Sequence, residues 1–529
     1  MYVVDYDCPI DFKSGTNTIA LSDEGFVVTG DLSNISGSVV ATYSQTQLSI
    51  NTAADIIALG EDNYQEVEIE TDSIVAPFVA DNKTITADTT QYYLYYAVVN
   101  TNKSNTTNQV YKSSITVETG DTMDEFYYLA RTGVLPGGSS SNTTIYSLTS
   151  NLDFSNYNWN VAATTASGTK ITIDGTEYSV LPNGFKGLFR GNGHTISNIS
   201  IDGNQEDVTA TDKYVNVFYK LDNGTIMDVK FDNIVLNGDA ASKQIGIIGD
   251  MVGGYVADVH ATRIEATGKE SAGGIIAKIS GGINNVNRCS LVNPIPSDVK
   301  SLESIQANLE YRITTTNKYE GGIIGNAQMN SDQDILYLNV YNCYVNALIG
   351  DGTDSGGNAG LLIGRCKGES VNYVLDIEHN VVYGMVVSKG QYQAGIVGDF
   401  DNGLAQVTIK YNIADVTFMY NSVYLNAYEA AISYAEQQYA HKNSSPIVGR
   451  AVHAEDGNYY TGYNIGSWVE YYKTYITSNS IAFDYSNYSE DGEFWTLNST
   501  MVYKTLGFDE DMWTFVTADH TVILTVLVG

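Results

Sequence analysis

Gly321-Gly-Ile-Ile-Gly325 is one copy of a block in which one or two glycines precede large aliphatic residues and a small residue. Counted between the glycines at 246, 274, 322, 360 and 395, the blocks are 28, 48, 38 and 35 residues apart. A period of a few tens of residues built from short β-type runs is typical of a solenoid. Steps longer than 28 residues predict either more than one coil or an insertion. The copies are Ile245–Gly249, Gly273–Ala277, Gly321–Gly325, Gly360–Gly364, Gly395–Gly398 and a degenerate copy at Pro446–Gly449.

Each part of the block has a physical role in a stacked coil. Glycine admits the tight corners, and the aliphatic residues fill a narrow, dry interior. Asparagine at stacked corners can donate its amide to the next coil. The pattern therefore predicts a right-handed parallel β-helix with one row of interior side chains. That row should comprise Ile247, Ile275, Ile323, Leu362 and Ile396.

The chain divides into three predicted parts. Residues 1–117 alternate apolar and polar residues between turn residues, which indicates a sandwich-like or jelly-roll-like β-module that could dock to a larger assembly. Residues 118–142 hold a helix, begun by the capping box Thr122–Glu125, and a glycine- and serine-rich linker. The helix places Met123, Phe126 and Leu129 on one face and is expected to cover the end of the solenoid. Residues 143–528 form the β-helix.

Two segments within the repeats have helical rather than β periodicity. They lie near 297–311 and 427–440, and neither glycine nor proline interrupts them. A helix inserted at one corner of a solenoid projects sideways and leaves the core intact. Such insertions often carry contacts to partners, so we expect at least one of them to contact another chain.

One stretch resembles a known family. The run Gly184-Phe-Lys-Gly-Leu-Phe-Arg-Gly-Asn-Gly-His-Thr-Ile-Ser-Asn-Ile199 is similar to the opening coil of GLUG-repeat β-helices, which occur in large surface proteins of gut bacteria and archaea. Leu506–Phe515 resembles the strand that closes these helices. The resemblance covers roughly 143–520 and implies a non-catalytic surface protein. It departs from the family at Asn216 and Val217, where the family has leucine and glycine, and in its irregular spacing.

Composition narrows the classes of partner. Aspartate and glutamate number 61 against 27 lysines and arginines, which gives a net charge of −34 over 529 residues. Such an acidic surface repels nucleic acid and anionic lipid. No apolar run approaches the length of a membrane span, and Met1–Asp5 lacks the features of a secretory signal. We expect an extracellular or cell-surface location, with a virion surface as the alternative.

Acidic pairs are the candidates for chemistry. Asp399 and Asp401 lie on one face of a short stretch, as a glycosidase acid pair would, but without a nearby basic residue to bind a uronate. His194, within the GLUG-like run, is expected to be a corner residue bonded to a neighbouring coil. No cofactor is predicted. Calcium is the one ion considered, at Asp509–Asp511 and Asp351–Asp354, which lack the ligand order of calcium loops.

Tyrosine runs are the candidates for ligand binding. Rings with hydroxyl groups suit stacking on sugars or on a protein partner, although half of each run could be core. The cysteines do not form a disulfide framework; Cys289 and Cys343 occupy comparable positions in two repeats and are expected to be buried thiols. The candidate ligand-binding tyrosines are Tyr93, Tyr95, Tyr460 and Tyr472.

Two functions remain open from the sequence. The first is a non-enzymatic structural or adhesive protein whose solenoid is a stiff spacer or binding wall for a glycan or protein, on a cell envelope or as a phage fibre or decoration protein, within a larger assembly or homo-oligomer. The second is a polysaccharide lyase or glycoside hydrolase of the β-helix class. Clustered carboxylates beside lysine or arginine on one face would favour the enzyme. An uninterrupted face of tyrosine, asparagine and threonine would favour adhesion.

Overall fold

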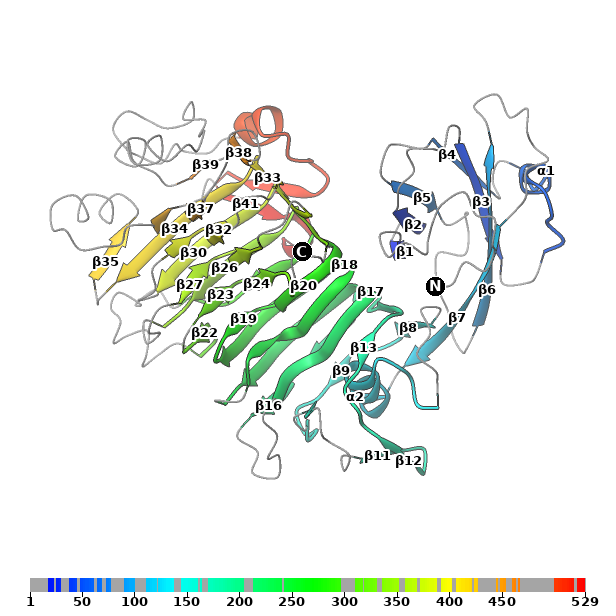
Figure 1. The fold of residues 1–529 in the computed structure, drawn as a ribbon, viewed down its shortest axis with the longest axis horizontal. Coiled ribbons are helices and arrows are strands. Elements are labelled where there is room, and N and C mark those ends of the chain that lie inside the picture. The colour runs from blue at the N-terminus through cyan, green and yellow to red at the C-terminus, as the bar shows by residue number, and fades with distance from the viewer. Residues whose placement is uncertain are drawn as a thin grey trace.

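The computed structural model shows a mostly β protein whose parallel strands stack in successive coils, as in a β-helix (Figure 1). It describes residues 18–22, 25–29, 38–44, 48–60, 64–68, 73–77, 90–99, 111–120, 122–137, 144–159, 162–163, 170–203, 213–239, 242–295, 310–316, 318–330, 335–351, 357–368, 372–387, 392–401, 406–420, 423–426, 444–445, 448–452, 459–462, 465–466, 499–517 and 521–528.

The first coils are built from β8 (Thr144–Leu148) and β9 (Leu152–Asp153), and then from β13 (Gly184–Phe185), β14 (Leu188–Arg190), β15 (Thr195–Ser197) and β16 (Ser200–Asp202). In the next two coils a single strand runs around the corners. These strands are β17 (Lys213–Asn237) and β18 (Gln244–Gly268), which pair in parallel along nearly their whole length.

Later coils are divided into separate strands that stack as four parallel ladders. The short ladder contains β19 (Ser271–Gly273), β23 (Tyr319–Gly321), β27 (Asn358–Gly360), β31 (Tyr392–Ala394) and β36 (Ser444–Ser445). Ladder A contains the first part of β20 (Ile276–Asn287), then β24 (Ile324–Gln328), β28 (Ile363–Lys367), β32 (Val397–Asp401) and β37 (Val448–Val452).

Ladders B and C complete each coil, and β17 and β18 extend both of them toward the N-terminus. Ladder B contains the second part of β20, then β25 (Leu336–Tyr341), β29 (Tyr373–Glu378), β33 (Gln406–Lys410) and β38 (Tyr459–Gly462). Ladder C contains β21 (Ser290–Val292) with β22 (Ile313–Thr315), then β26 (Tyr344–Ile349), β30 (Val381–Val387), β34 (Ile413–Tyr420) and β39 (Ile465–Gly466).

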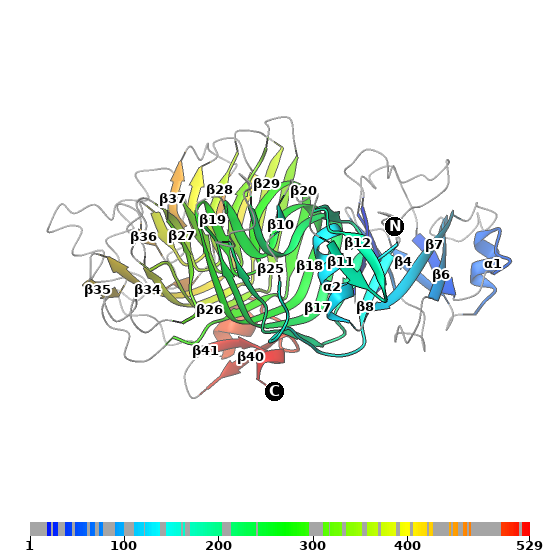
Figure 2. The same ribbon diagram turned by 90° about the horizontal axis from the view of Figure 1, so that it is seen from below.

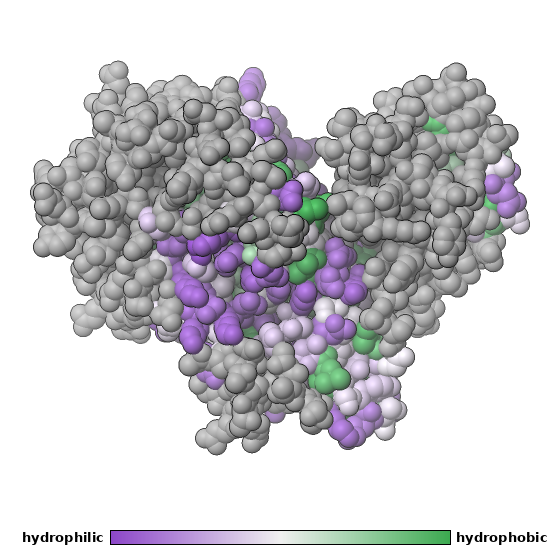
Figure 3. Space-filling model, viewed as in Figure 1, coloured by the Kyte–Doolittle hydropathy of each residue, from purple (hydrophilic) through white to green (hydrophobic). Residues whose placement is uncertain are grey.

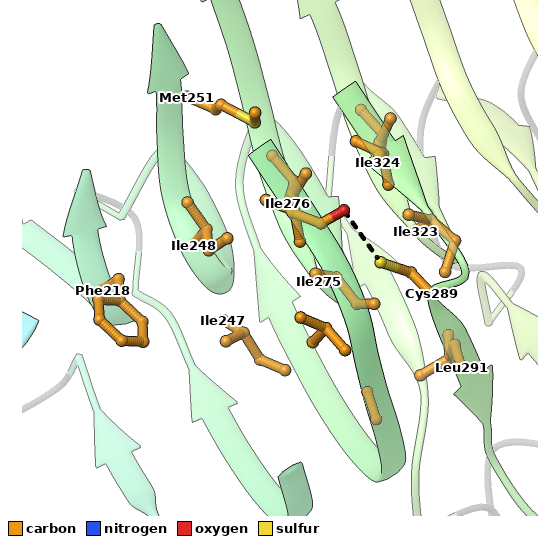
Figure 4. Close-up of a cluster of buried hydrophobic side chains, with 14 of the residues drawn as sticks. Phe218, Ile247, Ile248, Met251, Ile275, Ile276, Cys289, Leu291, Ile323 and Ile324 are labelled. Carbon is orange, nitrogen blue, oxygen red and sulfur yellow. Dashed lines mark hydrogen bonds between the residues drawn. The ribbon is translucent and has the colours of Figure 1, made fainter. Parts of the chain in front are cut away.

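The predicted interior row is confirmed. Its side chains are all fully buried, and the main chain of one coil bonds to the next along the row, as where the amide of Ile275 donates to the carbonyl of Ile323 at 3.3 Å. Figure 4 shows isoleucines from successive coils gathered between the strands, with Met251 and Leu291 beside them. Burial of this kind is the main source of stability in a solenoid. The row contains Ile247, Ile275, Ile323, Leu362 and Ile396.

The long sequence steps are single coils with insertions. Gly273 pairs directly with Gly321, 48 residues later, so the alternative of a second coil within this step is wrong. The extra residues lie between Val292 and Ile313, whose strands both stack on β26. Gly360 pairs with Gly321 and not with Gly322, which corrects the register by one residue. The predicted helices near 297–311 and 427–440 lie outside the described residues, except for Glu310 and Tyr311, which are not helical.

The corner between ladders B and C uses left-handed backbone in successive coils. The residues there have φ between 50° and 57°, although none of them is glycine. Just inside this corner, Asn412 accepts from the main-chain amide of Asn380 at 3.0 Å and donates to the carbonyl of Ile377 at 3.0 Å. The predicted asparagine ladder is therefore confirmed for these two coils. The left-handed row contains Asp228, Asp258, Arg288, Asn342, His379 and Tyr411.

The N-terminal part forms two antiparallel sheets and a short helix, α1 (Ala53–Ile57). One sheet contains β1 (Thr18–Ser22), β2 (Gly25–Thr29) and β5 (Ser73–Pro77). The other contains β4 (Gln65–Glu68), β3 (Ser38–Ser44), β6 (Thr90–Val99) and β7 (Tyr111–Gly120). Because β7 pairs in parallel with β8, the second sheet continues directly into the solenoid.

The predicted helix after this module is α2 (Met123–Thr132), with Thr122 as its N-cap. Phe126 is fully buried, and its ring lies 5.5 Å from that of Phe189 and 5.6 Å from that of Phe218, at the open end of the first coils. Leu129 is buried as predicted, whereas Met123 is 38% exposed and does not belong to the packed face. Beside the helix lies the hairpin of β11 (Lys170–Ile173) and β12 (Thr176–Ser179), and β10 (Ala162–Ala163) pairs antiparallel with β17.

The C-terminal segment, described for residues 499–517 and 521–528, does not extend the ladders. It contains a π-helical turn (Thr500–Thr505), the antiparallel pair β40 (Trp513–Val516) and β41 (Thr521–Leu524), and a 3-10 turn (Thr525–Leu527). It lies against the outside of ladder C, next to β26 in Figure 2. The expectation that Leu506–Phe515 closes the helix is wrong, because β40 pairs only with β41 among the described strands. Another antiparallel strand, β35 (Val423–Asn426), pairs with β34.

Candidate binding face

Ladder B turns two rows of polar side chains outward. In β25 and β29 buried and half-buried residues alternate, because successive side chains of a strand point to opposite faces of the sheet. Parallel pairing in register then stacks equivalent outward residues from coil to coil. We call these two rows the polar face. One row contains Tyr255, Asn285, Asn339, Asp376 and Thr408, and the other contains Asn287, Tyr341, Glu378 and Lys410.

Asparagines join the middle coils of the polar face. The amide of Asn339 donates to Asn285 Oδ1 at 2.8 Å. At the corner beside it, Asn342 donates to Asn287 Oδ1 at 3.2 Å. Each amide keeps further donor or acceptor capacity after such a bond, since an asparagine has two donor hydrogens and an acceptor oxygen. This part of the face therefore offers uncharged groups at the spacing of the strands.

The later coils place an acidic pair on the same face. Tyr341 donates its hydroxyl to Asp376 Oδ2 at 2.6 Å, and Lys410 donates to Glu378 Oε1 at 2.7 Å. Burial raises the pKa of Glu378 above its usual value; the bond from Lys410 lowers it, and the neighbouring Asp376 raises it further. The bond to Glu378 raises the pKa of Lys410. Two carboxyl groups and one ammonium group therefore lie together at this point.

The corner beside the polar face is also polar. Arg288 forms a two-pronged contact with Asp258 on the preceding coil, with its Nε 2.7 Å from Oδ1 and Nη2 2.6 Å from Oδ2. In the later coils His379 stacks on Tyr411, their ring centroids 5.1 Å apart. Burial lowers the pKa of His379. On the face shown in Figure 3, the described residues are mostly hydrophilic, and the hydrophobic ones form small patches.

Asp399 is not exposed as a catalytic acid would be. It lies in β32, fully buried, where it accepts from Asn358 Nδ2 at 2.7 Å. Arg365, in register with it on the preceding coil, has its Nε 3.3 Å from Asp399 Oδ2. The expectation that no basic residue lies nearby is therefore wrong, and Asp399 belongs to a buried ion pair. Asp401 follows in the same strand, which is not a turn, and its side chain is outside the described part.

The tyrosine candidates do not form one site. Tyr95 is 1% exposed, and its hydroxyl accepts from the amide of Leu48 at 2.8 Å, so its ring is in the core of the N-terminal module and not available to a ligand. Tyr93 lies in β6, with its side chain outside the described part. Tyr460 pairs with Thr408 and so continues one row of the polar face by register. Tyr472 lies outside the described residues.

His194 and the cysteines have structural positions. His194 lies two residues after the left-handed Asn192, at a corner. Its carbonyl oxygen accepts from the main-chain amide of Lys230 on the next coil at 3.0 Å, as expected for a corner residue. Cys289 and Cys343 are fully buried free thiols in equivalent positions of successive coils. Burial, together with the neighbouring Cys343, raises the pKa of Cys289.

The aspartates considered as calcium ligands contact other groups of the protein. Asp509 Oδ1 accepts from the amide of Asp511 at 2.9 Å, which is a local turn contact. Asp351 lies 3.6 Å from Arg312 Nη1, and Asp354 is outside the described part. Among the residues that the structure describes, no group of three or more histidine, cysteine, aspartate or glutamate side chains could hold a metal ion. None of the described helices is long and apolar enough to cross a membrane.

Sequence reasoning predicted stacked coils with corner asparagines but not the polar face. Asn287, Asn342, Asn380 and Asn412 lie at or beside the corner that follows ladder B. Aligning Asn342 with Asn380 would have placed Tyr341 beside His379, one residue away from Glu378, its partner in register. Because the insertions differ in length, the correct alignment requires the coil register and cannot be made by counting residues.

Comparison with known proteins adds little to this geometry. No protein-family model matches the chain, and no curated protein matches it. Among solved structures, it is similar to pectate lyase PelI from Erwinia chrysanthemi, crystallised with tetragalacturonic acid, at 11% identity, over 77% of this chain and 90% of that one, with a TM-score of 0.17. A likeness this weak carries no argument about activity. What stands is a mostly β chain of stacked parallel strands.

Proposed function

We propose that this chain is a non-enzymatic attachment or display protein, with the solenoid as a stiff wall and the polar face as its ligand surface. The solenoid is inferred to be a right-handed β-helix, because crossover connections between parallel strands are almost always right-handed. The two N-terminal sheets are inferred to form a sandwich-like docking module, which is joined to the wall through the parallel pairing of β7 with β8.

The observation that carries the proposal is the repetition along the polar face. Strands in a ladder lie about 4.8 Å apart, so one row repeats hydrogen-bonding groups at a fixed spacing. A glycan also repeats its hydroxyl groups along a chain. Tyr255 and Tyr341 add aromatic rings with polar ends, which suit contact with a sugar. A glycan laid across several coils would gain many weak, regularly spaced contacts.

The surroundings proposed for this function are the cell envelope or a virion surface. The resemblance of Gly184–Ile199 to GLUG-repeat surface proteins supports the envelope. The net charge of −34 supports a neutral glycan or a protein ligand over an anionic one, since like charges repel. The proposed partners are therefore a glycan or protein ligand and the larger assembly or second copy to which the N-terminal module docks.

The test is affinity for a panel of neutral, amino and acidic oligosaccharides, measured with the full chain. Asn339→Ala together with Tyr341→Phe should weaken binding about tenfold or more, because each substitution removes a polar group that would bond to the ligand or orient a neighbouring group that does. Asn237→Ala is the matched control, because Asn237 also bonds to the next coil, through Thr267 at 2.9 Å, but lies outside the polar face. Equal affinity in all three proteins would contradict the polar face as the ligand surface.

The second candidate is a polysaccharide lyase or glycoside hydrolase acting at Asp376 and Glu378. The observation that favours it is the carboxyl pair beside Lys410, of which Glu378 has the raised pKa expected of a general acid. Glu378→Gln separates the two functions. A hydrolase would lose turnover by orders of magnitude with little change in affinity. A binding protein would show no turnover before or after the change.

A further inference from the structure

The C-terminal segment has a hydrophobic core of its own. Phe508 and Trp513 are at most 3% exposed, and their rings meet edge to face at 5.2 Å. They pack with outward residues of ladder C, and this cluster is separate from the interior of the solenoid. The segment therefore adds a second layer outside the coil. The buried residues of this cluster are Tyr344, Val381 and Ile413 from ladder C and Val502, Leu506, Phe508, Trp513, Val522 and Leu524 from the C-terminal segment.

Side-chain hydrogen bonds attach this layer to the coils. Trp513 Nε1 donates to Asn342 Oδ1 at 3.4 Å, the amide of Val522 donates to Tyr383 Oη at 2.9 Å, and His379 Nε2 lies 3.1 Å from the carbonyl oxygen of Leu506. Within the described residues, β40 and β41 pair only with each other. Separation would therefore break no strand ladder.

The outward row of ladder C becomes apolar in the coils beneath this layer. Along the outward row of ladder C, the early coils carry Lys230, His260 and Ser290. The coils beneath the segment carry Tyr344, Val381 and Ile413 at the same row position. An apolar strip on an outward row is stable only when it is covered. The strip and the segment therefore belong together.

We propose that residues 499–517 and 521–528 form a detachable strap that closes over ladder C and opens as a unit while the coils remain stacked. Two separate cores make this possible, because opening exposes one cluster and leaves the interior row intact. Local opening of this kind occurs at a lower free energy than global unfolding. The open state would present the strip Tyr344–Val381–Ile413 to solvent and release the ring of His379, which adjoins Glu378 of the polar face. The proposal does not depend on the proposed function.

Hydrogen exchange read by mass spectrometry on the full chain tests the strap. Trp513→Ala removes its largest anchor and should speed exchange of the strap about a hundredfold. Exchange in β20, β24 and β25 should stay within about twofold of the unaltered protein. Val526→Ala is the matched control, since Val526 is 55% exposed, and should change neither.

A milder variant keeps the test open if Trp513→Ala fails to fold. Tyr383→Phe removes only the hydroxyl that accepts from Val522 and should speed strap exchange about fivefold, with the ladders unchanged. Exchange that accelerates in the strap alone supports the proposal. Acceleration of strap and ladders together would show a single cooperative unit, and unchanged strap exchange in both variants would show that these contacts do not hold it. Either result would overturn the proposal.

Discussion

The early coils of ladder C, formed by β17, β18 and β21, differ from its late coils, formed by β26, β30 and β34, on both faces of the sheet. On its outward row, Lys230 and His260 in the early coils give way to Val381 and Ile413 in the late ones. The backbone and the register do not change along the row. Outward positions of a solenoid therefore have no fixed polarity, and what packs on them determines which residues are stable there.

The inner corner changes in the opposite sense. Val229 and Val259 fill it in the early coils, followed by Cys289 and Cys343. In the late coils the same position holds Asn380 and Asn412, which bond to one another and to the main chain. The early half closes this corner by apolar contact and the late half by hydrogen bonds. Both solutions bury the position completely.

The largest loss of stability is expected in the interior row, where early and late coils carry the same kind of residue. Ile247→Asp and Ile323→Asp each place an unpaired charge in a fully buried position, and each should cost more than about 4 kcal/mol of the free energy of unfolding. Urea unfolding followed by circular dichroism measures the loss. Costs that differ by more than about 2 kcal/mol between the two variants would break the equivalence of the halves in the core.

The outward row should separate the halves. Val381→Asp introduces a charge beneath the strap and should weaken strap docking by about 3 kcal/mol. Lys230→Asp changes the same row position in an early coil, where the side chain is exposed, and should alter stability by less than about 0.5 kcal/mol. Local hydrogen exchange compares them. Equal effects of the two substitutions would mean that packing of the strap is not the reason why the outward row is apolar in the late coils.

His260 gives the early half a pH dependence. Burial lowers its pKa from 6.5 to about 4, so the unfolded chain binds a proton more readily than the folded one between these values. The stability that depends on the neutral ring is complete above pH 6.5 and is lost as pH falls toward 4, up to about 3 kcal/mol. The midpoint of denaturant unfolding should change less between pH 7 and pH 4 in His260→Gln than in the unaltered protein. An identical pH profile would contradict this assignment.

The corner asparagines should show the smallest effect. Asn412→Ala leaves the buried amide of Asn380 without its acceptor and should cost about 2 kcal/mol. Asn237→Ala, at an exposed position, should cost less than about 0.5 kcal/mol. The difference in unfolding midpoints measures what hydrogen bonding contributes to the late corner. No difference would show that packing alone closes it.

The coil interior could be predicted from sequence because its signal is local. Two large aliphatics beside glycine mark the interior whatever the length of the neighbouring insertions, and Ile323 lies where the block places it. The helix α2 could be predicted for the same reason, since Thr122 and the first turn specify its start.

The polar face and the strap depend on relations between distant residues. Arg365 is 34 residues from Asp399 in sequence but directly beside it in register, so the cation could not be found by proximity. A register error of one residue would turn an outward row inward, as the one-residue error at Gly360 illustrates. Trp513 and Phe515 alternate as they would in a closing coil strand, and nothing in that pattern distinguishes a strand outside the stack from one within it.

The central claim is that the solenoid binds without catalysing a reaction. The most direct measurement is incubation of the full chain with host-surface and capsular polysaccharides, following both retention of the glycan and the appearance of reducing ends or unsaturated uronates. The account predicts that an intact glycan is retained, that no product appears, and that Asn339→Ala with Tyr341→Phe reduces retention while Asn237→Ala does not. Product formation that is abolished by Glu378→Gln or Asp376→Asn would contradict it and establish the acidic pair as an active site.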